Sequence, residues 1–187
     1  METKKLTADD RIAGLKDLPL GDFWSWAYSD VLTNRNRSIF AGFMVASALG
    51  LLDVPRVEWD AVDLRYQGKG IEVKSAAYLQ SWQQKELSTI RFDIAKKRSW
   101  DARANTYAEE PMRSADCYVF CLYPETDPAK VDVLDVNAWQ FYVLSRIQID
   151  RELGERKSIG LQRLQSMCEP VGIISIFRGE DAPETGA

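Results

Sequence analysis

The 187-residue chain contains no histidine, and this absence excludes several kinds of active site at once. Without an imidazole there can be no Ser-His-Asp or Cys-His triad, no histidine-bound zinc, and no nuclease that uses histidine as its general base. Any catalysis must therefore depend on carboxylates, lysine, tyrosine, a thiol, or a metal ion held by oxygen ligands.

Cysteine is scarce, and long apolar runs are missing. The three cysteines, Cys117, Cys121 and Cys168, form no C-x-x-C pair and lie in or near apolar segments. We therefore expect buried free thiols rather than disulfides or a zinc site. No apolar run approaches the roughly 18 to 20 residues that span a membrane, and the charged N-terminus lacks the apolar core of a signal peptide. The sequence thus predicts a soluble, cytoplasmic protein with no membrane partner.

Positive charge is also in short supply. The chain has 24 lysine and arginine residues against 28 acidic ones, so that its formal net charge is -4. Binding of nucleic acid would therefore need a local basic surface. Two segments are candidates for such a surface. The first is a polar stretch that contains Lys96, Lys97, Arg98, Trp100 and Arg103, and a solvated loop is its alternative interpretation. The second directly precedes an apolar segment and contains Arg35 and Arg37.

Apolar periodicity predicts one α/β domain over residues 1–178, with an N-terminal helical extension, and a disordered acidic tail at 179–187. Three helices are expected early in the chain: a capped helix with Thr7 as N-cap, an aromatic helix whose stripe docks on the domain, and a buried helix. Alternating or continuously apolar runs predict the strands, and two short helices follow late in the chain. The expected ranges are helices at 7–18, 22–32, 37–52, 146–153 and 158–167, strands at 57–66, 71–79, 88–95, 116–123, 139–145 and 171–177, and an irregular arm at 96–115.

The best hairpin signal, over residues 57–79, also carries the most chemistry. Ile71 and Val73 alternate with Glu72 and Lys74, so a carboxylate and an ammonium share one face of a strand whose other face is apolar. On the preceding strand the apolar positions change from odd to even numbers. A one-residue β-bulge near Ala61 would reconcile the two halves, and bulges are frequent beside active sites.

With that bulge, the side chains of Asp60 and Asp63 both point away from the core. The length of the turn then decides which of the two shares a face with Glu72 and Lys74. A two-residue turn at 68–69 places Asp63 opposite Lys74 and on the same face as Glu72. A three-residue turn shifts the register by one residue and favours Asp60 instead. We prefer Asp63, with Asp60 as a close second.

A cluster of this composition suits a divalent cation. Two carboxylates aimed at one point repel each other unless a proton or a cation lies between them. Hard oxygen ligands suit Mg²⁺ or Mn²⁺, which keep several waters and bind substrate phosphate, and a nearby lysine can hold or deprotonate a water. Such a set is suited to phosphodiester hydrolysis. The alternative is a solvated strand face with an Asp63–Lys74 ion pair, worth under about 1 kcal/mol if exposed.

Asp63 (or Asp60), followed on the next strand by Glu72-x-Lys74, resembles the signature of the PD-(D/E)XK, or restriction-endonuclease-like, nuclease superfamily. The likeness to a group of short bacterial proteins in that superfamily extends from about Asp22 to Ser166. It includes the stretches EWDAVDLRYQGKGIEVKSAAYLQSW, WSWAYSD, ADCYVFCLY, WQFYV and KSIGL. The resemblance implies a three-layer sandwich in which helices flank a mixed central β-sheet.

The resemblance also implies roles for individual residues. Asp63 and Glu72, with the main-chain carbonyl of Val73, would bind Mg²⁺ (or Mn²⁺), and Lys74 would position a water. Gln80, six residues past that lysine, is similar to a glutamine found in several branches. The implied function is that of a Mg²⁺-dependent DNA endonuclease in restriction, phage defence or repair. We expect duplex DNA as its partner, and a homodimer would let two identical sites address two strands.

One position departs from the family pattern. Many members carry a glutamate on the helix before the hairpin, where it contributes to the metal site. Here Gly42 occupies the corresponding position, within the stretch AGFMVA. Loss of that ligand would weaken or abolish a second metal site. The alternative function is therefore that of a catalytically impaired relative that binds nucleic acid or a protein.

Overall fold

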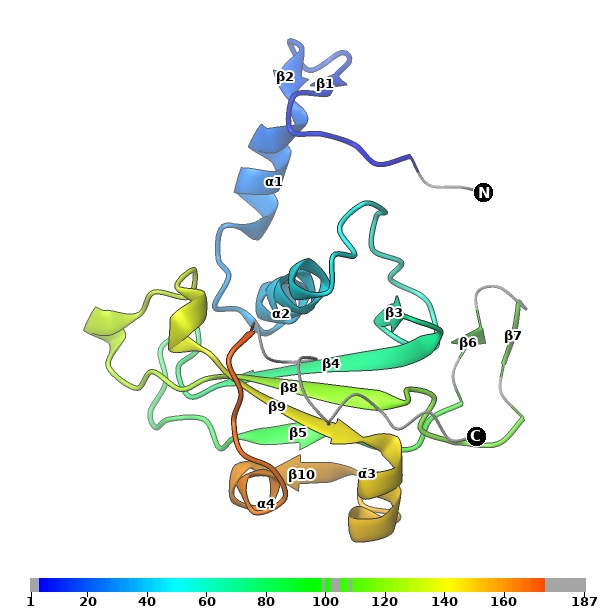
Figure 1. The fold of residues 1–187 in the computed structure, drawn as a ribbon. Helices are drawn as coiled ribbons and strands as arrows, with labels where there is room; N and C mark the ends of the chain where they lie inside the picture. The colour runs from blue at the N-terminus through cyan, green and yellow to red at the C-terminus, as the bar shows by residue number, and fades with distance from the viewer. Residues whose placement is uncertain (1–3, 99, 102–104, 108, 174–187) are drawn as a thin grey trace.

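The structure is a computed structural model that describes residues 4–98, 100–101, 105–107 and 109–173 (Figure 1). Arg103, most of the predicted strand at 171–177 and the predicted tail at 179–187 lie outside these residues. None of the helices in the described part of the chain is long and apolar enough to cross a membrane.

The described residues form a mixed α/β fold around a four-stranded sheet with the order β3-β4-β8-β9. β4 and β8 are parallel, whereas the outer strands β3 and β9 run antiparallel to their neighbours. The strand β8 is buried along its whole length, as its apolar sequence CYVFCLY predicts. The four strands are β3 (Leu64–Tyr66), β4 (Lys69–Ala77), β8 (Cys117–Tyr123) and β9 (Gln140–Ser145), and the last two confirm predicted strands.

The helix α2 (Asn34–Ala48) covers one face of this sheet (Figure 1). Its buried residues Ala41, Met44 and Val45 pack against a set of alternating sheet residues that includes Ile71, Val73, Val119 and Phe141. Gly50, with a φ of +69°, follows the helix in the left-handed conformation that glycine adopts readily. The predicted helix is thus present, but only one of its faces is buried.

The opposite face is covered by α3 (Arg146–Leu153), α4 (Leu161–Gln165) and a two-stranded sheet of β5 (Arg91–Asp93) and β10 (Ser158–Gly160). The helix α3 starts with a capping box, in which the side chains of Ser145 and Gln148 each accept the main-chain N–H of the other residue. The predicted strand at 88–95 therefore exists in part, but it pairs with β10 and not with the main sheet. The predicted helix at 158–167 begins as the strand β10, because its first residues pair with β5.

The prediction of a helix over residues 7–18 is wrong. This segment contains a small hairpin of β1 (Arg11–Ile12) and β2 (Leu18–Pro19). Thr7 is not a helix N-cap, because its N–H and hydroxyl donate to the carboxylate of Asp10 at 2.6 and 3.0 Å and close a turn. Positive φ angles then turn the chain, and a right-handed helix does not allow them; they occur at Gly14, Lys16 and Asp17.

The aromatic helix α1 (Leu20–Tyr28) forms as predicted, but its aromatic stripe does not dock on the domain. None of its nine residues, all of them described, is buried, and the side chain of Trp26 is 85% exposed. Figure 1 shows the reason, since α1 projects away from α2 and the sheet and carries the β1–β2 hairpin at its far end.

The strand predicted over 57–66 is much shorter than expected. Only β3 pairs with β4, and the described segment 57–63 is an irregular loop with no bulge at Ala61. Gln67 and Gly68 form the two-residue turn, both with positive φ, so that Arg65 lies opposite Gly70. Both predicted registers are therefore wrong, because the turn begins one residue earlier than we expected.

The cysteines are free thiols, as predicted. Cys117 and Cys121 are buried and Cys168 is partly buried. Burial raises the pKa of Cys117 to about 12, so this thiol is not ionised at neutral pH.

A buried arginine ties the arm to the layer beneath the sheet. Arg113, which is 2% exposed, donates from Nε to the carbonyl of Ile94 at 2.7 Å and from Nη2 to the carbonyls of Gly154 and Arg156 at 2.8 and 3.0 Å. Its Nη1 pairs with the carboxylate of Asp150. These contacts join Arg113 to the residue after β5 and to the end of α3 and the segment that leads into β10, so Arg113 fixes where the arm ends.

We predict that Arg113→Ala lowers the free energy of unfolding by about 3 kcal/mol, because it leaves buried carbonyl groups and Asp150 without their partner. Urea denaturation followed by circular dichroism measures this change. Arg35→Ala, at an exposed arginine on α2, is the control and should change stability by less than about 0.5 kcal/mol. A loss below about 1 kcal/mol for Arg113→Ala would contradict the structural role of this residue.

Candidate active site

The carboxylate of Asp63 binds the main chain of β4. Asp63 immediately precedes β3, and its Oδ2 accepts the N–H of Val73 at 2.8 Å. This side chain therefore supplies an acceptor at the point where β3 no longer pairs with β4. Because the N–H and C=O of one strand residue point to the same side, the carbonyl of Val73 faces the same edge as Asp63.

Glu72 and Lys74 lie on the other face of β4 from Ile71 and Val73, as the alternation predicts. Lys74 Nζ forms an ion pair with Glu72 Oε1, and both side chains are only about one-fifth exposed (21% and 22%). Burial raises the pKa of Glu72, the positive charge of Lys74 offsets part of this effect, and the negative charge of Asp63 adds to it. Asp63, Glu72 and Lys74 therefore form one electrostatic cluster.

This cluster opens into a cleft of about 260 Å³, which we call the carboxylate cleft. The arm, by which we mean the described residues of the segment 96–115, forms part of its lining. The described parts of the arm pair as β6 (Trp100–Asp101) with β7 (Thr106–Tyr107), and Lys97 pairs with Met112 through two main-chain hydrogen bonds of 3.0 Å. The described lining residues that matter for the argument are Asp63, Glu72 and Lys74 from the hairpin and Lys97, Arg98, Trp100 and Tyr107 from the arm.

The basic candidates of the arm are thus divided. Lys97, Arg98 and Trp100 lie at the carboxylate cleft, whereas Lys96 pairs with Glu155 at 2.5 Å. Arg103 lies outside the described residues. The stretch around Arg98 and Trp100 is therefore beside the carboxylates, which the sequence could not establish.

The proposal that Arg37 belongs to a basic surface is wrong, although its neighbour Arg35 is exposed. Arg37 is 3% exposed, and its Nη1 donates to the carbonyl of Leu32 at 2.8 Å and to Gln80 Oε1 at 3.2 Å. Burial lowers the pKa of Arg37 to about 10, so that it remains charged at neutral pH. Its role is to hold the start of α2 against the segment that follows β4.

Gln80 takes part in this same structural contact. Its Nε2 donates to the carbonyl of Ala77 at 3.0 Å and to Ser88 Oγ at 3.1 Å, in addition to the bond from Arg37. Gln80 is not among the described residues that line the carboxylate cleft. The structure therefore does not bring it to Glu72 and Lys74.

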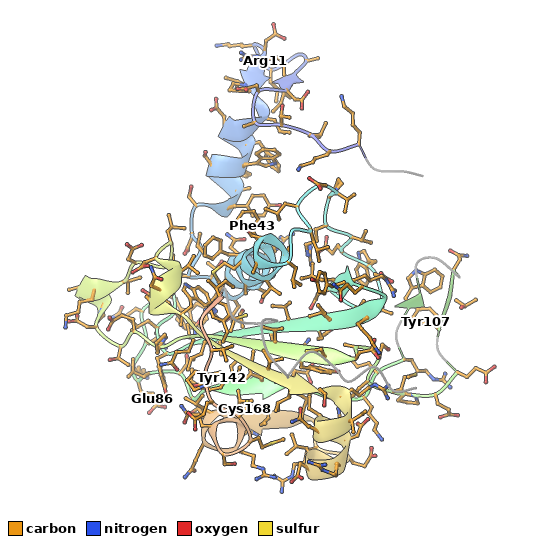
Figure 2. The ribbon with its side chains drawn as sticks, viewed as in Figure 1. Arg11, Phe43, Glu86, Tyr107, Tyr142 and Cys168 are labelled. Atoms are coloured by element: carbon orange, nitrogen blue, oxygen red, sulfur yellow. The ribbon has the colours of Figure 1, made fainter. Side chains whose placement is uncertain are left out.

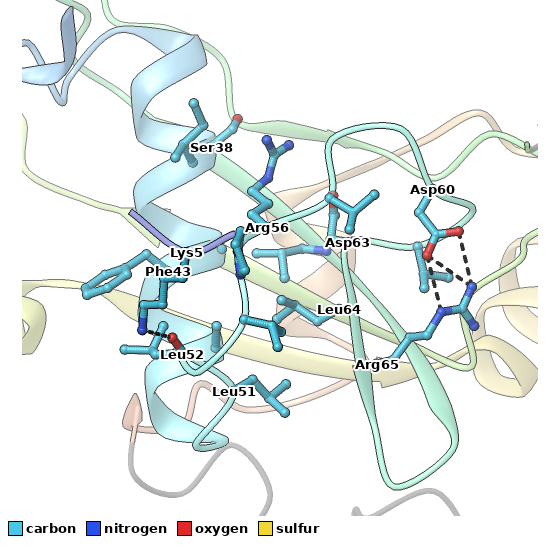
Figure 3. Close-up of a pocket in the computed structure, with 18 residues that line it drawn as sticks. Lys5, Ser38, Phe43, Leu51, Leu52, Arg56, Asp60, Asp63, Leu64 and Arg65 are labelled. Carbon is cyan, nitrogen blue, oxygen red and sulfur yellow. Dashed lines mark hydrogen bonds and ion pairs between the residues drawn. The ribbon is translucent and has the colours of Figure 1, made fainter. Parts of the chain in front are cut away.

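Asp60 is engaged differently from Asp63. Its carboxylate accepts Nε and Nη2 of Arg65 at 3.2 Å, and it also accepts the N–H of Ala61 at 2.7 Å (Figure 3). Asp60 lines the carboxylate cleft, but it is Asp63 that acts on the ionisation of Glu72. The geometry thus favours Asp63 as the partner of Glu72.

A larger, mostly apolar pocket of about 740 Å³ lies between α2 and the segment 51–65 (Figure 3). Asp60 and Asp63 line both this pocket and the carboxylate cleft. Gly42 faces the larger pocket, and no described heavy atom lies within 4 Å of the position that a Cβ would take. A side chain at position 42 would therefore enter this pocket, which Asp60, Asp63 and Val73 also line.

Several residues that line the carboxylate cleft were not predicted as site residues. Trp59, Asp93 and Tyr107 are three of them. Trp59 could have been found as an aromatic residue directly before Asp60 on a polar loop. Asp93 and Tyr107 come from β5 and β7, and only the tertiary fold places them here.

The site offers a metal ion only a few protein donors among the described residues. Within the described residues no group of three or more histidine, cysteine, aspartate or glutamate side chains is arranged to hold one. The set on offer is two carboxylates, Asp63 and Glu72, with the Val73 carbonyl at the same edge as Asp63. Mg²⁺ is commonly held by one or two carboxylates, keeps several waters and binds substrate phosphate, so these donors fit it better than a cation that needs a full protein cage.

Comparisons with protein-family models, with curated proteins and with solved structures found no significant match to this chain.

We predict that Glu72→Gln stabilises the metal-free protein more at pH 7 than at pH 4. Burial raises the folded-state pKa of Glu72 above its ordinary value, so the wild-type protein loses stability as the pH rises through that pKa. Glutamine cannot ionise and avoids this loss.

Urea denaturation in the presence of a chelator, at about pH 4 and about pH 7, measures the difference. Glu155→Gln, at a carboxylate whose side chain is 80% exposed, is the matched control. The account of the site is contradicted if the advantage of Glu72→Gln is the same at both pH values or is larger in acid.

Proposed function

We propose that the chain is a Mg²⁺-dependent nuclease that hydrolyses phosphodiester bonds in DNA, built on the restriction-endonuclease-like sandwich. One observation carries the proposal. The cluster of Asp63, Glu72 and Lys74 shares a single cleft with Lys97 and Arg98 of the arm. Acidic residues for a cation and basic residues for a phosphate backbone thus face the same space, although the chain as a whole is acidic.

Asp63 and Glu72, with the carbonyl of Val73, are the residues that would hold Mg²⁺ or Mn²⁺. The bound ion would polarise the scissile phosphate and stabilise the negative charge that develops on it. A cation beside Glu72 also compensates the burial and the repulsion from Asp63 that raise the pKa of this residue. The unfavourable electrostatics of these carboxylates on their own are therefore expected of a site that works with a cation.

Lys74 is the residue that handles the attacking water. It lies on the same strand face as Glu72 and is paired with it. When a cation takes over the charge of Glu72, the ammonium group of Lys74 can donate a hydrogen bond to a water. In this position it would orient the oxygen toward phosphorus and stabilise the negative charge that develops as the water gives its proton to bulk solvent. The new P–O bond would form as the P–O bond to the leaving sugar oxygen breaks, and that oxygen would take up a proton from solvent.

The arm would hold the substrate. Arg98 is exposed and forms no ion pair or hydrogen bond with the other described residues, so its guanidinium is free to bind a phosphate. Lys97 is paired with Asp93 at 2.5 Å, in an exposed contact that a phosphate could replace. Such contacts position a nucleic acid and do not read its sequence.

A second candidate function is that of a catalytically impaired relative that binds nucleic acid or a protein. Gly42 favours it, because the larger pocket beside Asp63 has room for a glutamate that this chain does not carry. In that case wild-type protein would not cleave DNA, and Gly42→Glu would produce cleavage by adding a ligand.

We predict that purified protein cleaves plasmid, linear duplex or single-stranded DNA with Mg²⁺ or Mn²⁺, and that Lys74→Ala lowers the rate by at least about 100-fold. Gel analysis of timed reactions measures it. Lys130→Ala, at a lysine whose side chain is 71% exposed, is the matched control and should retain the wild-type rate. Cleavage that is unchanged in Lys74→Ala would contradict the proposed mechanism.

A further inference from the structure

Aromatic side chains line the carboxylate cleft, and two of them are largely exposed. Trp59 comes from the loop that leads to Asp63 and is 80% exposed, and Tyr107 comes from β7 and is 68% exposed. Trp100 lies against Tyr107, with ring centroids 4.9 Å apart and an interplanar angle of 63°. Figure 2 shows Tyr107 on the arm, well away from the packed interior around Tyr142. The cleft thus presents aromatic surface from two separate segments of the chain.

The charge of the cleft is not that of a surface built for a duplex. Its described lining residues include five carboxylates and four cationic groups. Among the cationic groups, Lys74, Lys97 and Arg113 are already paired with Glu72, Asp93 and Asp150, respectively. Phosphate contacts dominate the affinity for duplex DNA, and this lining offers few of them.

Exposed aromatic rings, in contrast, gain binding energy only where the face of a base is available. In a duplex the bases are stacked on one another, whereas a single strand can place its bases on protein side chains. Stacking of this kind contributes about 1–3 kcal/mol per base and tolerates any sequence. A few cationic groups together with exposed aromatic rings are therefore better matched to a single strand than to a duplex.

We propose that the carboxylate cleft takes single-stranded nucleic acid, with Trp59 and Tyr107 as base-stacking residues and Arg98 as the contact to phosphate. This inference deepens the proposed function, on which it rests, by naming the class of substrate. It replaces the duplex that the family resemblance suggested. The rings place the strand across Asp63, Glu72 and Lys74, so that its backbone lies at the carboxylates.

The test measures binding of fluorescently labelled oligothymidylate and oligouridylate of roughly 12 nucleotides, and of a hairpin duplex with a similar number of phosphates. Fluorescence anisotropy with the full chain carrying Lys74→Ala, in Mg²⁺, keeps the probes intact. We expect single strands to bind at least about tenfold more tightly than the duplex, and Trp59→Ala and Tyr107→Ala each to weaken single-strand binding about tenfold.

Two matched variants test the assignment to stacking. Tyr107→Phe keeps the ring and should retain binding within about twofold, whereas Trp26→Ala removes an exposed tryptophan from α1 and should have no effect. A preference for the DNA or for the RNA strand supports the inference equally, because every base has a face on which a ring can stack. Equal or tighter binding of the duplex, or single-strand binding that Trp59→Ala and Tyr107→Ala leave unchanged, overturns it.

The failure of this inference and that of the proposed function can be told apart. Single-strand binding that depends on Trp59 and Tyr107, in a wild-type protein that cleaves no DNA with Mg²⁺ or Mn²⁺, contradicts the nuclease function and supports the binding mode. Lys74-dependent cleavage of duplex DNA, with no preference for single strands in the binding assay, supports the nuclease function and overturns the binding mode.

Discussion

One hydrogen bond determines the shape of the candidate site. The N–H of Val73 donates to the carboxylate of Asp63 at 2.8 Å, directly beyond the last pair of β3 and β4. Bonds to an ionised acceptor are stronger than neutral ones. This bond holds the end of the irregular loop 57–63 against the edge of β4, places Asp63 near Glu72, and brings Trp59 to the cleft on the same loop.

The same geometry makes the site electrostatically unfavourable in the absence of a cation. Glu72 is largely buried, its pKa is raised, and the neighbouring charge of Asp63 adds to the increase, while Lys74 compensates only in part. Groups with such perturbed ionisation are frequent at functional sites, because binding of a charged ligand relieves the repulsion. Under the proposed function no overall positive charge is required, because attraction of a nucleic acid would be local to the arm and supplemented by stacking.

The sequence predicts those parts of the fold that depend on local pattern and misses those that depend on tertiary placement. The apolar composition of β8 and the alternation in β4 suffice to locate the central sheet and the shared face of Glu72 and Lys74. The preferred register was wrong by two residues because the turn begins at Gln67, which adopts a left-handed conformation. Asp63 still joins the cluster, because its carboxylate accepts the N–H of Val73 beyond the last strand pair. Burial of Arg37 and the position of the arm depend on contacts distant in sequence, which no local pattern encodes.

The central claim is that Asp63 and Glu72 together hold a divalent cation. Anomalous diffraction from crystals soaked in Mn²⁺ tests it most directly, since manganese scatters anomalously and the metal can be located independently of the protein. We predict a peak between the carboxylates of Asp63 and Glu72, which is lost in Glu72→Gln. Its absence from wild-type crystals, or a peak beside Asp60 that persists in Glu72→Gln, would contradict the account.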